Sequence, residues 1–283
     1  MHGSSGGRKM AYRKRIIRAL LLLFLPLQLI GLERQPWFSD VYEFHFLGGY
    51  TYSYYSKVNH AINQLTSTSN DHLLSFGLEF SPDPNWSIDG DLEFVQTPRQ
   101  HFGFRSIGVQ GRYLWKDDII GDPVSFTTGF NFRFTSPRSL KDVSCPHHAN
   151  ADFQFNFALG KELDYFRFWR YRIWGFGEIG FANAGSPWFE GLFSLEGNYD
   201  DLHKWAAFLY GGHGYGRNSF VDINRFRGYG KIRYKFVDVG ARYGYRLNVW
   251  GSLRFEYVRR VFAKAYPEHV NFFTFSYLLP FSF

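Results

Sequence analysis

The chain has 283 residues, of which 21% are aromatic, and its mean hydropathy is −0.29. It is long enough for one large domain, and it is rich in aromatic residues yet polar on average, as expected when one face of each strand is apolar and the other is wet. The single cysteine, Cys145, excludes an internal disulfide framework. A free thiol and a cross-link to another chain both stay open for it.

Residues 1–31 are predicted to be a secretory signal peptide, with Met10 as a possible start. An apolar run of 12 residues, 19–30, follows a segment that holds six basic residues and no acidic one, which is the order typical of such a leader. A spanning helix needs about 20 apolar residues, so a retained anchor is only the alternative. Without the leader the chain has 26 basic and 25 acidic residues in place of 32 and 25, and its charge therefore predicts no nucleic-acid partner.

From residue 42 onward, apolar and polar side chains alternate in a series of short segments, as in strands with one apolar face. In the first of them, 42–54, Tyr42, Phe44 and Phe46 share one face, and Glu43 and His45 share the other. The later segments are 74–80, 86–94, 104–116, 123–135, 152–159, 169–182, 189–196, 204–214, 226–246, 253–257 and 271–283. Short connections near 81–85, 116–122, 198–203 and 247–250 alternate with longer ones near 57–71, 136–150, 214–225 and 263–270. We expect the short connections to face the periplasm and the longer ones to face outward.

These segments predict an all-β fold over residues 32–283: a transmembrane, antiparallel, up-and-down β-barrel of about 12 strands. Segment 226–246 is irregular, because its aromatic face changes near Val237. No Gly or Asn stands there to form a two-residue hairpin, so we expect one bulged strand, and a split would lead to the alternative of 14 strands. A secreted β-sandwich or propeller would have to bury the aromatic faces against a second sheet, and no blade-like repeat is present.

The C-terminal segment carries the sharpest motif. Its alternate positions are apolar and mostly aromatic, namely Phe273, Phe275, Tyr277, Leu279, Phe281 and Phe283. This pattern resembles the closing strand of bacterial outer-membrane β-barrels, a family of general porin-like proteins whose chains commonly end in Phe. The resemblance implies an outer-membrane location, contact with its lipid, and recognition of this strand by the barrel-assembly machinery.

Charged residues on the polar faces predict a channel. A basic ladder lies opposite the aromatic face of segment 226–246 and continues beyond it, and acidic residues lie on other strands. The predicted pore-lining residues are Arg225, Arg227, Lys231, Arg233, Lys235, Arg242, Arg246, Arg254, Asp89, Asp91, Glu93, Glu190 and Glu196. Opposed charged walls would set a field across a water-filled pore. We therefore expect passive diffusion of small hydrophilic solutes, with some preference for anions. The alternative is a lumen that these charges plug by pairing, since a barrel of this size is intermediate between filled and open ones.

Other functions have weaker signals. A lipid-modifying barrel enzyme would need a nucleophile and a base in contact, and His213 and Ser219 are merely close in sequence. Cys145, His147, His148 and Asp152 have spacings seen in metal sites, but such groupings also arise by chance in loops, and neither a metal nor a cofactor is expected. A surface adhesin or structural barrel would depend on the loops 57–71 and 136–150.

Overall fold

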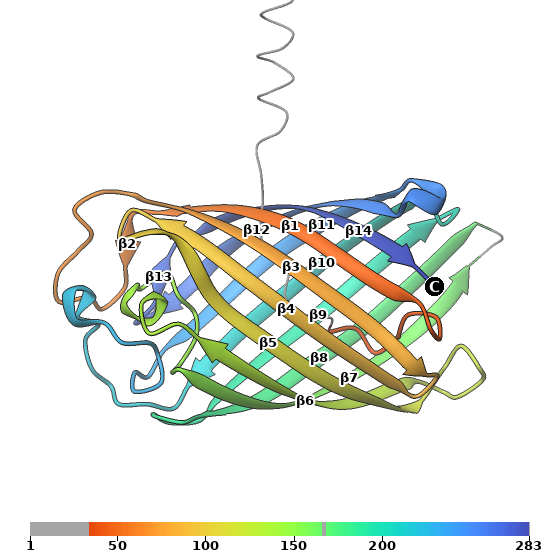
Figure 1. Ribbon diagram of the computed structural model, residues 1–283, viewed down its shortest axis with the longest axis horizontal. Coiled ribbons are helices and arrows are strands. Elements are labelled where there is room, and N and C mark those ends of the chain that lie inside the picture. Colours follow the sequence, from red (N-terminus) through yellow and green to blue (C-terminus); the bar gives the residue numbers. More distant parts are fainter. Residues whose placement is uncertain (1–33, 166–167, 283) are drawn as a thin grey trace, which may run out of the picture.

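The computed structural model describes residues 34–165 and 168–282, which form one closed barrel of 12 antiparallel strands (Figure 1). Each barrel strand pairs with its neighbours in the chain, and the first pairs with the last. The strands are β1 (Phe44–Tyr55), β3 (Ser69–Asp83), β4 (Trp86–Thr97), β5 (Gln100–Lys116), β6 (Ser125–Thr135), β7 (Ala151–Tyr165), β8 (Trp169–Ala182), β9 (Trp188–Tyr199), β10 (His203–Gly214), β11 (Lys235–Arg246), β12 (Ser252–Lys264) and β14 (Asn271–Phe281). The predicted up-and-down barrel and its strand number are confirmed.

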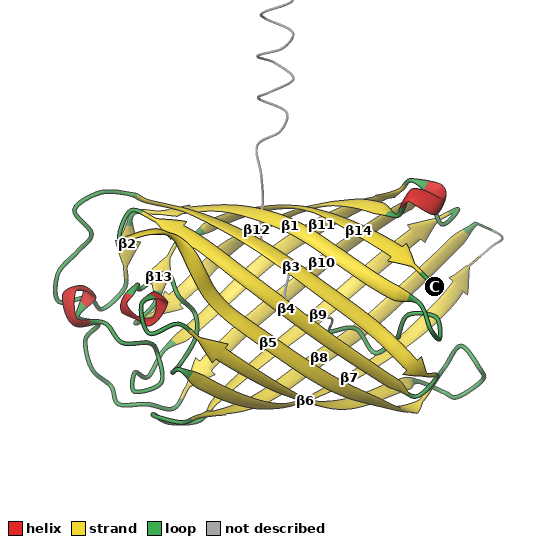
Figure 2. Ribbon diagram, in the orientation of Figure 1, coloured by secondary structure: helices red, strands yellow, loops and turns green. Residues whose placement is uncertain are grey.

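The remaining elements are short and lie in the connections (Figure 2). Strands β2 (Lys57–Val58) and β13 (Pro267–Glu268) form a separate two-stranded sheet. Three single-turn 3-10 helices are η1 (Ser139–Lys141), η2 (Ile223–Arg225) and η3 (Asn248–Trp250). No helix within the described ranges is long and apolar enough to cross a membrane.

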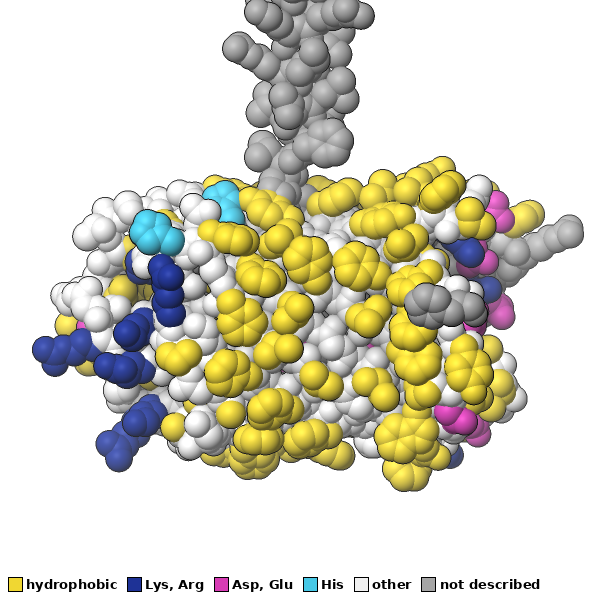
Figure 3. Space-filling model, viewed as in Figure 1, with side chains coloured by type: hydrophobic (Ala, Val, Ile, Leu, Met, Phe, Trp, Pro, Cys, Tyr) yellow, Lys and Arg dark blue, Asp and Glu magenta, His cyan; other side chains and the backbone are white. Residues whose placement is uncertain are grey.

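Alternation along each strand separates an apolar outer surface from a polar interior. On β6, Phe130 is 53% exposed, whereas Asn131 beside it is 5% exposed. On β5, Val109 is 51% exposed and Gln110 only 2%. Exposed apolar side chains from every strand form a belt around the barrel, part of which is visible in Figure 3. The barrel therefore has the surface that a lipid bilayer requires, and its closed sheet leaves no unpaired edge in the hydrocarbon.

The two ends of the barrel differ in their connections. Short turns join β3 to β4, β5 to β6, β9 to β10 and β11 to β12 at the end where the described C-terminal residues lie, on the right in Figure 1. Loops 56–68, 136–150, 215–234 and 265–270 lie at the other end. This is the alternation of short and long connections that the sequence predicts. We call the two ends the turn end and the loop end.

The predicted strand 226–246 is wrong in its first half. Only Lys235–Arg246 is a strand, and residues 226–234 belong to the loop that follows β10. The expected irregularity lies in the neighbouring strand: Val237 pairs with Phe262 and Asp238 with Arg260, which leaves Val261 of β12 as the extra residue of a bulge. Along β11 itself the alternation is continuous, with Phe236 buried inside and Val237 exposed outside.

On β14 the predicted apolar face does point outward. Phe273, Phe275 and Tyr277 lie outside, and the side chains between them, such as Thr274 and Ser276, are buried inside the barrel. Phe281 ends the strand, where it stacks on Phe44 of β1 with ring centroids 5.4 Å apart. The predicted signal peptide, 1–31, and the terminal Phe283 lie outside the described residues.

Candidate functional site in the barrel lumen

One wall of the lumen, formed by β3 to β6, carries a row of buried acids. Asp89, Asp91 and Glu93 follow one another on the inner face of β4 and are 3–8% exposed. Each acid contacts an arginine of β5 or β6. Arg112 Nε lies 3.2 Å from Asp89 Oδ2, Arg133 Nη2 lies 2.8 Å from Asp91 Oδ1, and Arg105 Nε lies 3.5 Å from Glu93 Oε2. Pairing of this kind is what makes buried charge tolerable. The three acids predicted on this strand therefore lie in the lumen, each with a cationic neighbour.

This wall holds more acids than bases. Its inward carboxylates are Asp71, Glu79, Asp89, Asp91 and Glu93, and its inward cations are Arg105, Arg112 and Arg133. Five negative charges thus face three positive ones, a surplus of two negative charges. The alternating acids of β4 can be read from the sequence. Which arginine lies beside each acid depends on the strand register and on the β-bulge between the pairs Glu93–Ser106 and Phe94–Phe104 of β4 and β5.

The opposite wall, formed by β10 to β12, is basic. Its inward cations are Lys204, Arg242, Arg254 and Arg260, and its inward carboxylates are Asp238 and Glu256. Arg242 Nε is 2.7 Å from Glu256 Oε2, and Arg260 Nε is 2.7 Å from Asp238 Oδ1. Lys204 and Arg254 flank Gly244 between them. This wall therefore has a surplus of two positive charges, and in the order of the sheet it lies across the barrel from β4 and β5.

The basic wall is only partly the one that the sequence predicts. Arg242 and Arg254 lie on it, and Arg246 is exposed at the turn end of β11. Arg225, Arg227, Lys231 and Arg233 belong to the loop before β11, where all four are exposed, and Lys235 points outward from the first position of that strand. The prediction that these five cations line the lumen is wrong. Tyr234 and Phe236, which the sequence predicts to face lipid, face the interior instead. Sequence reasoning missed Lys204 and Arg260.

Between these walls, β8 and β9 bring two more acids together. Glu178 and Glu190 are direct cross-strand partners on the inner face. Glu190 accepts a hydrogen bond from the Tyr210 hydroxyl, and the Arg34 guanidinium lies 4.8 Å from the centre of the Tyr210 ring. Further toward the turn end, Glu196 accepts a hydrogen bond of 2.9 Å from Trp174 Nε1. Both predicted acids, Glu190 and Glu196, thus face the lumen.

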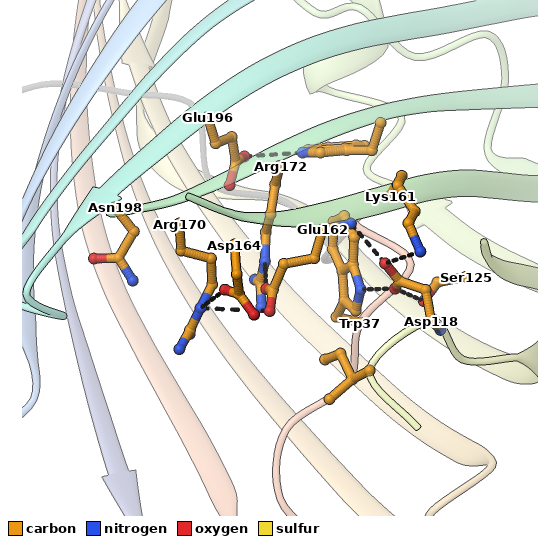
Figure 4. Close-up of polar contacts among 12 residues, drawn as sticks. Trp37, Asp118, Ser125, Lys161, Glu162, Asp164, Arg170, Arg172, Glu196 and Asn198 are labelled. Carbon is orange, nitrogen blue, oxygen red and sulfur yellow. Dashed lines mark hydrogen bonds and ion pairs between the residues drawn. The ribbon is translucent and has the colours of Figure 1, made fainter. Parts of the chain in front are cut away.

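The chain segment before β1, residues 34–43, enters the lumen from the turn end. Trp37 is 5% exposed and packs against Ala158, Trp174 and Phe176. Its indole Nε1 donates a hydrogen bond of 2.9 Å to Asp118 Oδ1. The turn that holds Asp118 and the ends of β7 and β8 add ion pairs around it (Figure 4). We call residues 34–43 the inner segment. The alternation pattern could not reveal it, because the segment makes no strand pairing.

At the loop end an aromatic cluster closes the barrel. It joins loop residues to the tops of the strands and consists of Tyr55, Val58, Val143, Val221, Phe226, Tyr229, Tyr234, Phe236, Ala265, Tyr266 and Val270, each at most 5% exposed. The Tyr229 hydroxyl donates a 2.8 Å hydrogen bond to the carbonyl of Val143, which ties loop 215–234 to loop 136–150. We call this packed set of loops the outer plug.

Loop 136–150 also makes the polar contacts beneath the plug. His147 Nε2 lies 3.3 Å from Glu93 Oε2, and burial lowers the pKa of His147 to about 4. His148 stacks on Trp188 with ring centroids 3.5 Å apart and is hydrogen-bonded to the Tyr234 hydroxyl. Cys145 is a buried free thiol whose pKa is raised by burial to about 11. In the part of the chain that the structure describes, no three His, Cys, Asp or Glu residues are grouped so as to hold a metal ion.

A cavity of about 290 Å³ remains between the inner segment and the outer plug. Its lining includes Arg34 of the inner segment, His147 of the plug, Glu93 and Arg133 of the acidic wall, and Arg242 of the basic wall. Apolar side chains such as Phe208 complete it. The cavity therefore touches both charged walls and both closing segments.

No protein-family model and no curated protein matches the chain. Among solved structures, the COG4313 outer membrane channel from Pseudomonas putida F1 superposes with a TM-score of 0.55 at 11% identity, covering 90% of this chain and 100% of that one. The NanC porin gives 0.49 at 10% identity over 83% and 98% of the two chains, and the KdgM porin gives 0.44 at 8% over 84% and 99%. At identities this low the similarity concerns the fold alone. Of these three superpositions, the one with the COG4313 channel has a TM-score high enough to support it. The predicted fold, a closed up-and-down β-barrel like that of an outer-membrane channel, is confirmed.

Proposed function

We propose that this barrel is a gated outer-membrane channel that passes small hydrophilic solutes by passive diffusion and prefers anions. The observation that carries the proposal is the cavity of about 290 Å³ between walls of opposite charge, in a barrel with the fold of an outer-membrane channel. Charged rows in a lumen orient and select polar solutes.

The preference for anions follows from where the surplus charges lie. On the acidic wall each carboxylate of β4 has an arginine within 3.5 Å, so its charge is largely compensated close by. On the basic wall Lys204 points inward from β10, and its side chain is exposed to the lumen. A solute that crosses near the turn end would therefore meet an accessible cation.

Gating follows from how the loop end is closed. The outer plug is made of loops, so it can move away while every barrel strand keeps both of its neighbours. Its packed aromatic cluster favours the closed state. A barrel that never opens and acts as a surface adhesin or structural protein is the second candidate, and the same cluster is the observation in its favour.

Single-channel recording in a planar bilayer separates these two functions. We expect the refolded protein to be closed most of the time and to open in discrete steps. Tyr229→Ala should raise the open probability, because it removes a ring from the centre of the plug and its hydrogen bond to the Val143 carbonyl. Arg242→Gln with Arg254→Gln should shift the reversal potential in a salt gradient away from anions. If protein with a verified β-sheet spectrum stays silent, and the Tyr229→Ala variant does too, the barrel is a non-conducting one.

A further inference from the structure

Six basic residues cluster on the outside of the barrel at the loop end. They are Arg217, Lys231, Arg233, Lys235, Arg259 and Lys264, which we call the basic rim. Backbone hydrogen bonds of 2.9 and 2.8 Å join Arg217 to Lys231 and to Arg233. Lys235 and Lys264 are direct cross-strand partners on β11 and β12, and Arg259 lies five residues earlier on β12. The rim is therefore one continuous patch over two strands and the loop before them.

Five cations of the rim lie above the apolar belt, and Arg259 lies at its upper edge, opposite Val239. On β11 the outward positions after Lys235 are Val237 and Val239, which are 38% and 42% exposed. On β12 the exposed Val261 and Phe262 lie just below Lys264. Cations one or two residues beyond the belt lie at the depth of lipid headgroups, and long side chains extend toward that layer. The lumen is not the partner of Lys235, Arg259 and Lys264, because these side chains point outward from β11 and β12.

Acidic side chains in the described part of the chain do not neutralise the rim. Among the described residues, none of the six forms a side-chain ion pair. The nearby acids have other contacts: Asp222 caps η2 by accepting from the backbone of Asn224 and Arg225, and Glu268 pairs with Lys57 at 3.0 Å. On the face that Figure 3 shows, most Lys and Arg side chains lie at the loop end and most Asp and Glu side chains lie at the turn end. Six like charges held together call for an anion from outside the chain.

We propose that the basic rim binds the phosphate groups of membrane lipids. The site combines cations at headgroup depth with apolar side chains directly below, so one lipid can place its phosphate on the rim and its acyl chains on the belt. Phosphate is well matched to paired arginine and lysine donors. Each cation near an anionic lipid surface contributes about 1 kcal/mol, so three of them change the affinity on the order of 100-fold.

Titration calorimetry of the full chain in a non-ionic detergent tests the proposal. The probes are a short-chain phosphatidic acid, the matching phosphatidylcholine and inorganic phosphate. We expect phosphatidic acid to bind more tightly than either of the others. The variant Lys235→Gln, Arg259→Gln, Lys264→Gln should weaken this binding on the order of 100-fold. The control Lys141→Gln, Arg225→Gln, Arg227→Gln removes the same charge from exposed loop positions and should bind as the wild type does.

Three results would overturn the proposal. One is unchanged binding by the rim variant, and another is an equal loss in the control, which would reveal only an effect of net charge. The third is inorganic phosphate binding as tightly as the lipid, which would mean a site for free anions. Should the rim variant fail to refold, the wild type alone decides: high salt must weaken phosphatidic acid binding selectively, and salt-independent binding would refute the role of the cations.

Discussion

Acid should loosen the outer plug through His147. The imidazole is buried beneath the plug among three charged groups, Glu93, Arg105 and Arg133, and its pKa falls from 6.5 to about 4, chiefly because burial disfavours the charged form. Between these two values the undocked loop binds a proton that the docked loop does not. Docking therefore has its full stability above about pH 6.5 and loses it as the pH falls toward 4.

The size of the effect follows from the same pKa. A shift from 6.5 to about 4 corresponds to about 3 kcal/mol of docking free energy. The population of undocked loop should accordingly rise about 300-fold over this range. A loop that is undocked only once in many thousand molecules at neutral pH would then be open often enough to detect.

Cys145 offers the readout, because it is buried in the same loop two residues before His147. Labelling by a disulfide reagent that reacts with thiols in mild acid, such as dithiodipyridine, should speed up steeply below pH 6.5. In His147→Gln, which keeps a polar group but cannot take up the proton, the rate should be nearly flat over the same range. An equally steep rise in that variant would show that other groups drive opening and would refute this reasoning.

Three further substitutions test the packing of the barrel. Arg133→Leu leaves two buried carboxylates without their bridging cation and should cost about 3–5 kcal/mol in denaturant unfolding of the refolded barrel; a loss below 1 kcal/mol would mean that the pair is effectively solvated. Gly180→Ala should lower stability by about 1–3 kcal/mol, because its Cβ would lie 2.0 Å from the ring of Trp188, whereas Gly111→Ala, with no atom within 4 Å of its Cβ, should be tolerated. Phe193→Arg on the lipid face should cost about 2–4 kcal/mol in vesicles and much less in detergent, and an equal cost in both would place this position outside the hydrocarbon.

The sequence predicts the barrel well because alternation is a local property. On β14, Phe273 and Phe275 reveal their face without any knowledge of their neighbours, and every second residue follows. The same rule fails at Tyr234 and Phe236. Their alternation is genuine, but the apolar surroundings of these rings are Tyr229 and Tyr266 of the plug, and not lipid. Periodicity shows that one face of a strand is apolar, but it does not show whether that face contacts lipid or the protein interior.

The lumen could be predicted only in part, since its contacts join distant strands. Asp91 is visible as an inward acid from β4 alone, but its partner Arg133 lies 42 residues further along the chain. Which arginine meets which acid depends on the stagger between strands and on single-residue bulges. The inner segment gave no signal either, because Trp37 packs without pairing its backbone to a strand.

The opposite net charges of the two walls contribute to the stability of the closed barrel. A surplus of two negative charges on one wall and of two positive charges on the other would be costly in a dry interior, because uncompensated net charge is strongly disfavoured there. Asp71 and Glu93 of the acidic wall and Arg242 and Arg254 of the basic wall line one cavity of about 290 Å³, so the two walls attract each other across it. Neutralising one surplus charge on one wall alone should therefore lower the free energy of unfolding. Neutralising one charge on each wall should lower it by less than the sum of the two single effects. Such coupling between Arg254→Gln and Asp71→Asn, which both line the cavity, would be measurable as a double-mutant cycle in unfolding experiments. Additive effects would mean that solvent or the paired arginines already screen each wall completely.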